Sequence, residues 1–111
     1  MELPPVDPRD YVRRLLEAYR ATPGTAGVVR RADRLLAMQL QERGLPLEAV
    51  ENALVLAAAR RIIRPAEAPP LGIVRSLAYF LPVIEEVLQL KVSQEYFQHL
   101  RRRLHRATSA R

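Results

Sequence analysis

The chain has 111 residues, of which 49% are hydrophobic and 27% are charged, and it contains no cysteine. This composition is that of one folded domain with a single core, and it excludes disulfides, cysteine-ligated zinc and thiol catalysis. The formal net charge of +6 favours a polyanionic partner, most simply nucleic acid. Among the 18 basic residues only Lys91 is a lysine, and a GC-rich genome produces the same bias towards arginine.

The length of the apolar runs and the composition of the N-terminus indicate the location of the protein. No apolar run approaches the ~18–20 residues that a membrane-spanning helix needs. The first ten residues are acidic and proline-rich, whereas a signal peptide has a basic start and an apolar centre. We therefore expect a cytoplasmic protein that does not act at a membrane.

The first predicted helix follows a short extended lead, residues 1–6. It begins at Pro8, because proline suits the first turn of a helix and Asp7 can cap it. Its apolar residues recur at helical spacing and form one stripe: Tyr11, Val12, Leu15, Leu16 and Tyr19. A Thr-Pro-Gly break at residues 22–24 ends this helix.

The second predicted helix covers residues 27–43, and Gly44 is a natural residue to end it. Arginines at positions 30, 31 and 34 occupy its first half, where positive charge opposes the helix dipole. This placement hints that they serve something other than helix stability. The expected buried face consists of Val28, Val29, Ala32, Leu35, Leu36 and Leu40.

Residues 46–64 predict a central helix that is buried on nearly every side. From Val50 to Ile63 the sequence is apolar except for Glu51, Asn52, Arg60 and Arg61. A helix that is apolar all round must be surrounded by other elements. Pro65 ends it, and residues 66–70 form a stiff, exposed connection.

The fourth predicted helix covers residues 71–91 and is interrupted by Pro82. An interior proline removes one backbone hydrogen bond and clashes with the preceding turn, so it either kinks a helix or breaks it. We expect a kink, because the apolar stripe continues in phase across the proline. That stripe consists of Ile73, Leu77, Phe80, Leu81, Ile84, Val87 and Leu88.

The fifth predicted helix begins after Ser93, a possible cap, and residues 107–111 form a frayed tail. Its core face consists of Tyr96, Phe97, Leu100 and Leu104. Strand-like alternation is absent throughout. The sequence thus predicts an all-α, single compact five-helix domain over residues 1–111, with the 46–64 helix at its centre.

Catalytic patterns are missing from these helices, so we expect neither an enzyme nor a cofactor or metal. His99 and His105 are six residues apart and cannot share a helix face as metal ligands do at i, i+4 spacing. Glu85 and Glu86 are adjacent, and adjacent side chains diverge on a helix. No histidine stands in a recognisable frame beside the three serines, Ser76, Ser93 and Ser109.

Arginine clusters are the strongest functional signal in the sequence. They occur in three of the expected helices: Arg30, Arg31 and Arg34; Arg60, Arg61 and Arg64; and Arg101, Arg102, Arg103 and Arg106. Pairs four residues apart place two guanidinium groups along one helix face, which can follow a phosphate backbone. Base reading would need further polar side chains, so binding without sequence preference is the better interpretation.

Two stretches between Gly44 and Val87 carry a pattern of proline, acidic, aromatic and aliphatic residues. In the first stretch these are Pro46, Glu48, Val50, Ala53 and Ala57. In the second they are Arg75, Ser76, Leu77, Tyr79, Phe80, Val83, Ile84 and Val87. Over Gly44 to Val87 the chain resembles the C-terminal helical domain of DnaD-type replication-initiation proteins.

The resemblance implies a helical DNA-binding domain that contacts other replication proteins, in a bacterium, phage or mobile element. It also implies that the residues after the tyrosine-bearing helix contact DNA, here Lys91 and the arginines of the last helix. The alternative is a small protein–protein adaptor, for example a homodimer, whose arginines only keep it soluble. For the aromatic pairs at 79–80 and 96–97, core packing and contact with a partner both remain open.

Overall fold

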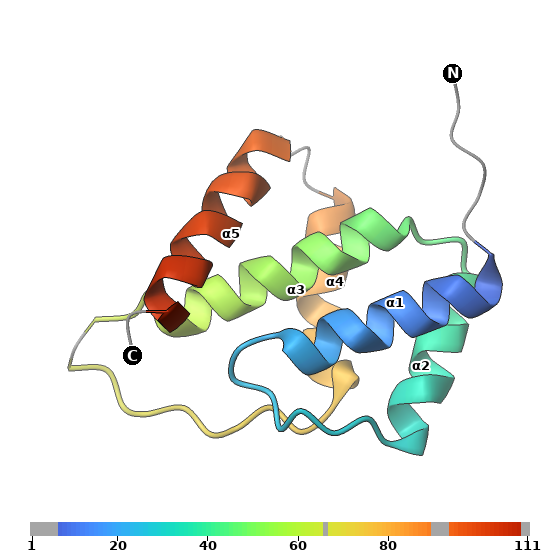
Figure 1. The fold of residues 1–111 in the computed structure, drawn as a ribbon, viewed down its shortest axis with the longest axis horizontal. Coiled ribbons are helices and arrows are strands. Elements are labelled where there is room, and N and C mark those ends of the chain that lie inside the picture. The colour runs from blue at the N-terminus through green and yellow to red at the C-terminus, as the bar shows by residue number, and fades with distance from the viewer. Residues whose placement is uncertain (1–6, 66, 90–93, 110–111) are drawn as a thin grey trace.

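Five α-helices and one 3₁₀ helix make up the fold in the computed structural model, which describes residues 7–65, 67–89 and 94–109 (Figure 1). The helices are α1 (Pro8–Ala21), α2 (Arg31–Glu42), α3 (Leu47–Ile62), the 3₁₀ helix η1 (Leu77–Phe80), α4 (Leu81–Gln89) and α5 (Gln94–Ser109). These residues contain no strand, so the predicted all-α class is confirmed. Within the same ranges, no helix is both long enough and apolar enough to cross a membrane.

The central position of α3 is also confirmed. It packs against α1, α4, α5 and η1, and Figure 1 shows it running through the middle of the molecule with α5 crossing its C-terminal half. Many of its buried residues are alanines, whose small side chains let neighbouring helices approach closely. The buried set is Leu47, Val50, Asn52, Ala53, Leu54, Leu56, Ala57, Ala58 and Ala59.

Helix α1 begins where the sequence predicted. The Asp7 carboxylate accepts a hydrogen bond of 2.9 Å from the Arg9 backbone N–H, and Pro8 occupies the first turn. Four residues of its apolar stripe are buried, Tyr11, Leu15, Leu16 and Tyr19. The predicted lead, residues 1–6, lies outside the described residues.

Helix α2 starts at Arg31, four residues later than predicted. Residues 28–30 are not helical, and Gly27 before them has a φ of +75°, a value that favours glycine. The prediction of the buried face was partly wrong, because three of its members are exposed: Val28, Ala32 and Leu35. The helix ends as expected at Gly44, which has a φ of +76°.

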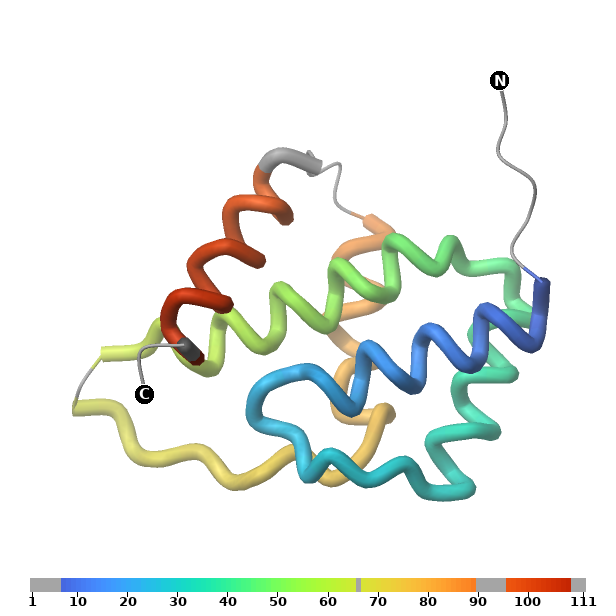
Figure 2. Tube along the Cα trace, in the orientation of Figure 1, coloured from blue at the N-terminus to red at the C-terminus, as the bar shows by residue number. Residues whose placement is uncertain are grey.

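The fourth helix is shorter than predicted and carries no proline kink. Residues 71–76 are not helical, because Val74 pairs with the turn after α1: its N–H donates to the Gly24 carbonyl (2.8 Å), and its carbonyl accepts from Ala26 (2.9 Å). Figure 2 shows these two segments meeting at the lower edge of the molecule. Pro82 therefore lies in the first turn of α4, where its missing N–H is not needed.

The apolar stripes of the last helices were predicted only in part. Phe97, Leu100 and Leu104 of α5 are buried, but Tyr96 is exposed. Ile73 and Leu88 of the expected fourth helix are exposed as well. The structure continues α5 to Ser109, into the predicted tail, while the proposed cap Ser93 lies outside the described residues.

Candidate nucleic-acid interface

The three arginine clusters differ in what their guanidinium groups contact. At the end of α3, Arg60 binds the carboxylate of Glu86 on α4 through its two terminal nitrogens, Nη1 and Nη2. The distance from Nη1 to Oε2 is 2.8 Å. This hydrogen bonding raises the pKa of Arg60 and lowers that of Glu86. The contact joins two neighbouring helices.

The other two arginines of α3 hold the connection that follows the helix. Arg61 donates to the Tyr79 hydroxyl at 3.1 Å and to the Gly72 carbonyl, and its guanidinium lies 5.4 Å from the centre of the Tyr79 ring. Arg64 donates to the Pro69 carbonyl at 2.8 Å. All three arginines of this predicted site therefore have partners inside the molecule, so the cluster serves the fold.

The two adjacent glutamates of α4 point to different helices, as predicted. Glu85 accepts a hydrogen bond of 2.9 Å from Arg43, which follows α2, while Glu86 binds Arg60 of α3. Both carboxylates thus neutralise arginines of the domain itself. They are not arranged as a catalytic pair.

At the start of α2, the arginines are exposed, and the structural role falls to a buried aspartate. Asp33 is 1% exposed, and its carboxylate accepts the N–H of Arg30 and the N–H of Leu77, both at 2.9 Å. It fixes the first turn of α2 to η1. The sequence signal for this role is the place of Asp33 three residues after the cap, where an acidic side chain can bind back to the backbone of the cap residue.

Helix α5 presents two opposite faces. Phe97, Leu100 and Leu104 are buried against the core. A second stripe of side chains lies on the opposite side of the helix. It begins at His99, two residues after Phe97, and its members have i, i+3, i+4 and i+7 spacing. It consists of the exposed residues His99, Arg102, Arg103 and Arg106 and is called the α5 stripe below.

The arginines of the α5 stripe form no ion pair with any carboxylate among the described residues. The ion pairs found there involve Arg13, Arg14, Arg43 and Arg60. The sequence itself contains no aspartate or glutamate after Glu95. The three arginines of the α5 stripe are therefore a row of positive charge that the fold leaves open to solvent.

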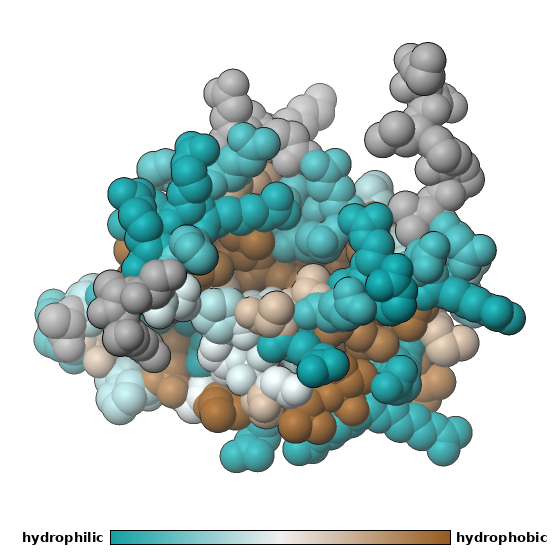
Figure 3. All heavy atoms as spheres, in the orientation of Figure 1, coloured by the Kyte–Doolittle hydropathy of each residue, from teal (hydrophilic) through white to brown (hydrophobic). Residues whose placement is uncertain are grey.

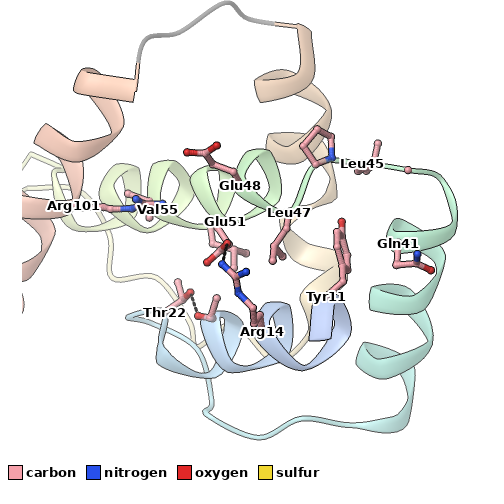
Figure 4. Close-up of a pocket in the computed structure, with 14 residues that line it drawn as sticks. Tyr11, Arg14, Thr22, Gln41, Leu45, Leu47, Glu48, Glu51, Val55 and Arg101 are labelled. Atoms are coloured by element: carbon pink, nitrogen blue, oxygen red, sulfur yellow. Dashed lines mark hydrogen bonds and ion pairs between the residues drawn. The ribbon is translucent and has the colours of Figure 1, made fainter. Parts of the chain in front are cut away.

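Arg101 differs from its three neighbours on α5. It lies beside the core face of the helix, and its Nη2 donates to the amide oxygen of the buried Asn52 on α3 at 2.9 Å. In Figure 4 it reaches into a groove between α1 and α3, where Arg14 lies 3.6 Å from Glu51. Burial, followed by the charge of Glu51, raises the pKa of Tyr11 in the same groove.

The arginines of α2 and α5 do not merge into one surface. Helices α5 and α2 lie at opposite ends of the molecule in Figure 1, so their arginines face different regions of solvent. Figure 3 shows hydrophilic residues, in teal, gathered where α5 lies. Lys91, the remaining predicted contact, lies outside the described residues. The α5 stripe is consequently the best candidate for a phosphate-binding surface.

Comparisons with protein-family models, with curated proteins and with solved structures found no match to this chain. The resemblance to DnaD-type domains thus stays a prediction that rests on the residues quoted for it. The geometry of the arginines is the structural feature that bears on function.

Proposed function

We propose that this chain is a non-catalytic, cytoplasmic DNA-binding accessory protein that contacts the phosphate backbone through the α5 stripe. Binding is without sequence preference. The resemblance of residues 44–87 to DnaD-type domains supports a link to replication initiation or to a mobile element, with replication proteins as further partners.

The observation that carries this proposal is the spacing of the stripe together with the finding that its arginines form no ion pair among the described residues. Three arginines and one histidine follow one another along two turns of an exposed helix face. From His99 to Arg106 the stripe is about 10 Å long, since a helix rises ~1.5 Å per residue. That length corresponds to about three phosphate-to-phosphate steps of one strand, at ~3.4 Å per step along the axis of a duplex.

Backbone contact is favoured over base reading by the residue types. Guanidinium groups bind phosphate oxygens readily, and such contacts position a protein without selecting a sequence. Recognition of bases would need a row of asparagine, glutamine or arginine inserted into a groove. On α5, Gln98 is the exposed amide beside the stripe among the residues whose side chains the structure describes, whereas the stripe itself consists of arginines and one histidine.

A titration of the protein with single- and double-stranded DNA at about 50 and 200 mM salt tests this proposal. Neutralising three phosphates gives a slope of roughly −2 to −3 in log affinity against log salt. The affinity should therefore fall about 20- to 40-fold between the two salt concentrations, and unrelated sequences should bind alike. Undetectable DNA binding at the lower salt concentration, or a DNA affinity that does not change with salt concentration, would refute the proposal.

The adaptor hypothesis gives a different result in the same experiments. In that case DNA would not bind at low salt, and sedimentation would show a stable dimer or a complex with a protein partner. A monomer that binds DNA in a salt-dependent manner supports the α5 stripe as the working surface.

A further inference from the structure

A second surface, distant from α5, combines apolar side chains with arginines: the groove between α1 and α2. Its volume is about 870 Å³, within the ~300–1,000 Å³ that is typical of binding pockets. In Figure 3 a brown, hydrophobic area bordered by teal residues lies at lower right, where Figure 1 places these helices. The apolar lining comes from Pro8, Val12, Leu16, Val28, Val29 and Met38.

Several apolar side chains in and beside this groove are unusually open to solvent. Val28 is 56% exposed and Met38 is 46% exposed, and Leu35, one turn before Met38 on α2, is 48% exposed. Neighbouring apolar side chains that stay exposed together are typical of an interaction surface. Methionine is well suited to such a surface because its flexible side chain adapts to different partners.

The charged rim of the groove determines what kind of partner fits. Arg9, Arg20 and Arg34 line it from α1 and α2, and none of them is ion-paired to a carboxylate in the described part of the chain. Arg13 also lines it, but its charge is already shared with Asp10 and Glu17 at 3.4 Å. Glu42 lines the groove as well, so its four arginines face two glutamates, Glu17 and Glu42. The rim thus keeps a positive balance around an apolar floor, which complements a partner with acidic edges and an apolar centre.

The walls of the groove favour a helical partner. Two of them are α-helices whose backbone groups are bonded internally, so they offer little hydrogen bonding to an extended peptide. An α-helix satisfies its own backbone and can lay apolar side chains at i, i+3, i+4 and i+7 into a groove. A nucleic acid would find the arginines but would leave Val28 and Met38 without apolar partners.

We propose that the groove between α1 and α2 binds an acidic amphipathic helix of a partner protein. The apolar face of that helix packs on Val28 and Met38, and its carboxylates meet Arg9, Arg20 and Arg34. This assigns Arg34 to protein binding, whereas the sequence had placed it in the nucleic-acid surface. The protein would then contact DNA and a protein partner at opposite ends.

Three synthetic helical peptides of about 16 residues test the proposal by fluorescence anisotropy with the full chain. The first carries leucines at i, i+3, i+4 and i+7 with glutamates around them, the second replaces its glutamates with lysines, and the third replaces its leucines with alanines. The first peptide should bind at least about tenfold more tightly than either of the others, since it alone matches both floor and rim.

Two matched variants locate the binding. Met38→Ser removes an apolar contact from the groove, while Ile73→Ser removes a still more exposed apolar side chain from the connection before η1. We expect Met38→Ser to lower the affinity for the first peptide about tenfold and Ile73→Ser to leave that affinity unchanged. Both positions are exposed, and circular dichroism melts of the two variants should match the parent chain.

Four outcomes would overturn the proposal. The lysine peptide could bind as well as the glutamate peptide, or Met38→Ser could have no effect on binding. Single-stranded DNA could displace the peptide from the groove, which would make the groove a nucleic-acid site. Sedimentation could also show self-association that Met38→Ser abolishes, which would make a second copy of the chain the occupant.

Discussion

Helices α3 and α5 have the same length and carry the same arginine spacing, yet their arginines do different things. Each helix has 16 residues and carries two adjacent arginines with a third four residues after the first, in the sequences RRIIR and RRLHR; in RRIIR the third, Arg64, lies just after the end of α3. In the α3 cluster all three arginines bind groups of the domain, whereas on α5 they are exposed to solvent without an ion pair in the described structure. Spacing alone therefore does not identify a binding surface.

The surroundings of the two helices explain this difference. Other elements pack on several sides of α3, so its arginines have carboxylate and carbonyl oxygens within reach. Only one stripe of α5 is buried, and nothing covers its opposite face among the described residues. An arginine cluster becomes structural when neighbours supply acceptors, and remains open for a ligand when they do not.

The largest expected effect is the loss of stability when a buried leucine of either helix is shortened to alanine. Leu54→Ala in α3 should lower the free energy of unfolding by about 2–5 kcal/mol, because Leu54 is 1% exposed at the centre of the domain. Leu104→Ala in α5 should fall near the lower limit of that range, since Leu104 lies at the edge of the core. Urea denaturation measures both. A cost below about 1 kcal/mol for Leu54→Ala would show that α3 is not central.

The next effect compares single arginines from the two helices. Arg61→Ala should cost about 1–2 kcal/mol, because it removes hydrogen bonds to Tyr79 and Gly72 and a cation–π contact. Arg103→Ala, the matched control on α5, should cost less than about 0.5 kcal/mol. Equal costs in urea denaturation would mean that the two arginines do not differ in structural role.

The smallest effect is a pH dependence of stability, which arises from the contact between Arg60 of α3 and Glu86 of α4 and has no counterpart in the arginines of the α5 stripe. Arg60 lowers the pKa of Glu86 below its usual value of 4.5. Because the folded-state pKa is the lower one, this stabilisation is complete above about pH 4.5 and is lost as the pH falls through the folded-state value. Thermal melts should show the parent chain losing slightly more stability than Glu86→Gln between pH 6 and pH 3. Identical losses would contradict the prediction.

Local signals in the sequence were sufficient to place several helix ends. The cap at Asp7, the first-turn Pro8 and the terminating Gly44 all act within a few residues of where they stand. The burial of α3 was equally visible, because a run without a polar face has only one stable environment.

Contacts between distant segments were not visible in the sequence. Residues 71–76 continue an apolar stripe, but Val74 bonds to Gly24 and Ala26, some fifty residues earlier, instead of forming a helical turn. Asp33 and Leu77 are 44 residues apart. The roles of Arg60 and Arg102 likewise depend on which acceptors the fold brings near them, and repeated spacing carries no such information.

The α5 stripe can be tested directly against the arginines of α2, which have the same spacing. One variant changes Arg102, Arg103 and Arg106 to alanine, and the control variant changes Arg30, Arg31 and Arg34 to alanine. Each removes three positive charges from the net charge of +6, from arginines that are exposed on α5 or at the start of α2. Any effect of overall charge is therefore the same in both variants.

The decisive measurement is DNA affinity against salt concentration for the parent chain and these two variants. We expect the α5 variant to lose most of its affinity at low salt and about 2–3 units of its log–log salt slope, because three phosphate contacts are gone. The α2 variant should keep a slope close to that of the parent chain. Equal losses in the two variants, or an unchanged slope in the α5 variant, would contradict the assignment of DNA binding to α5.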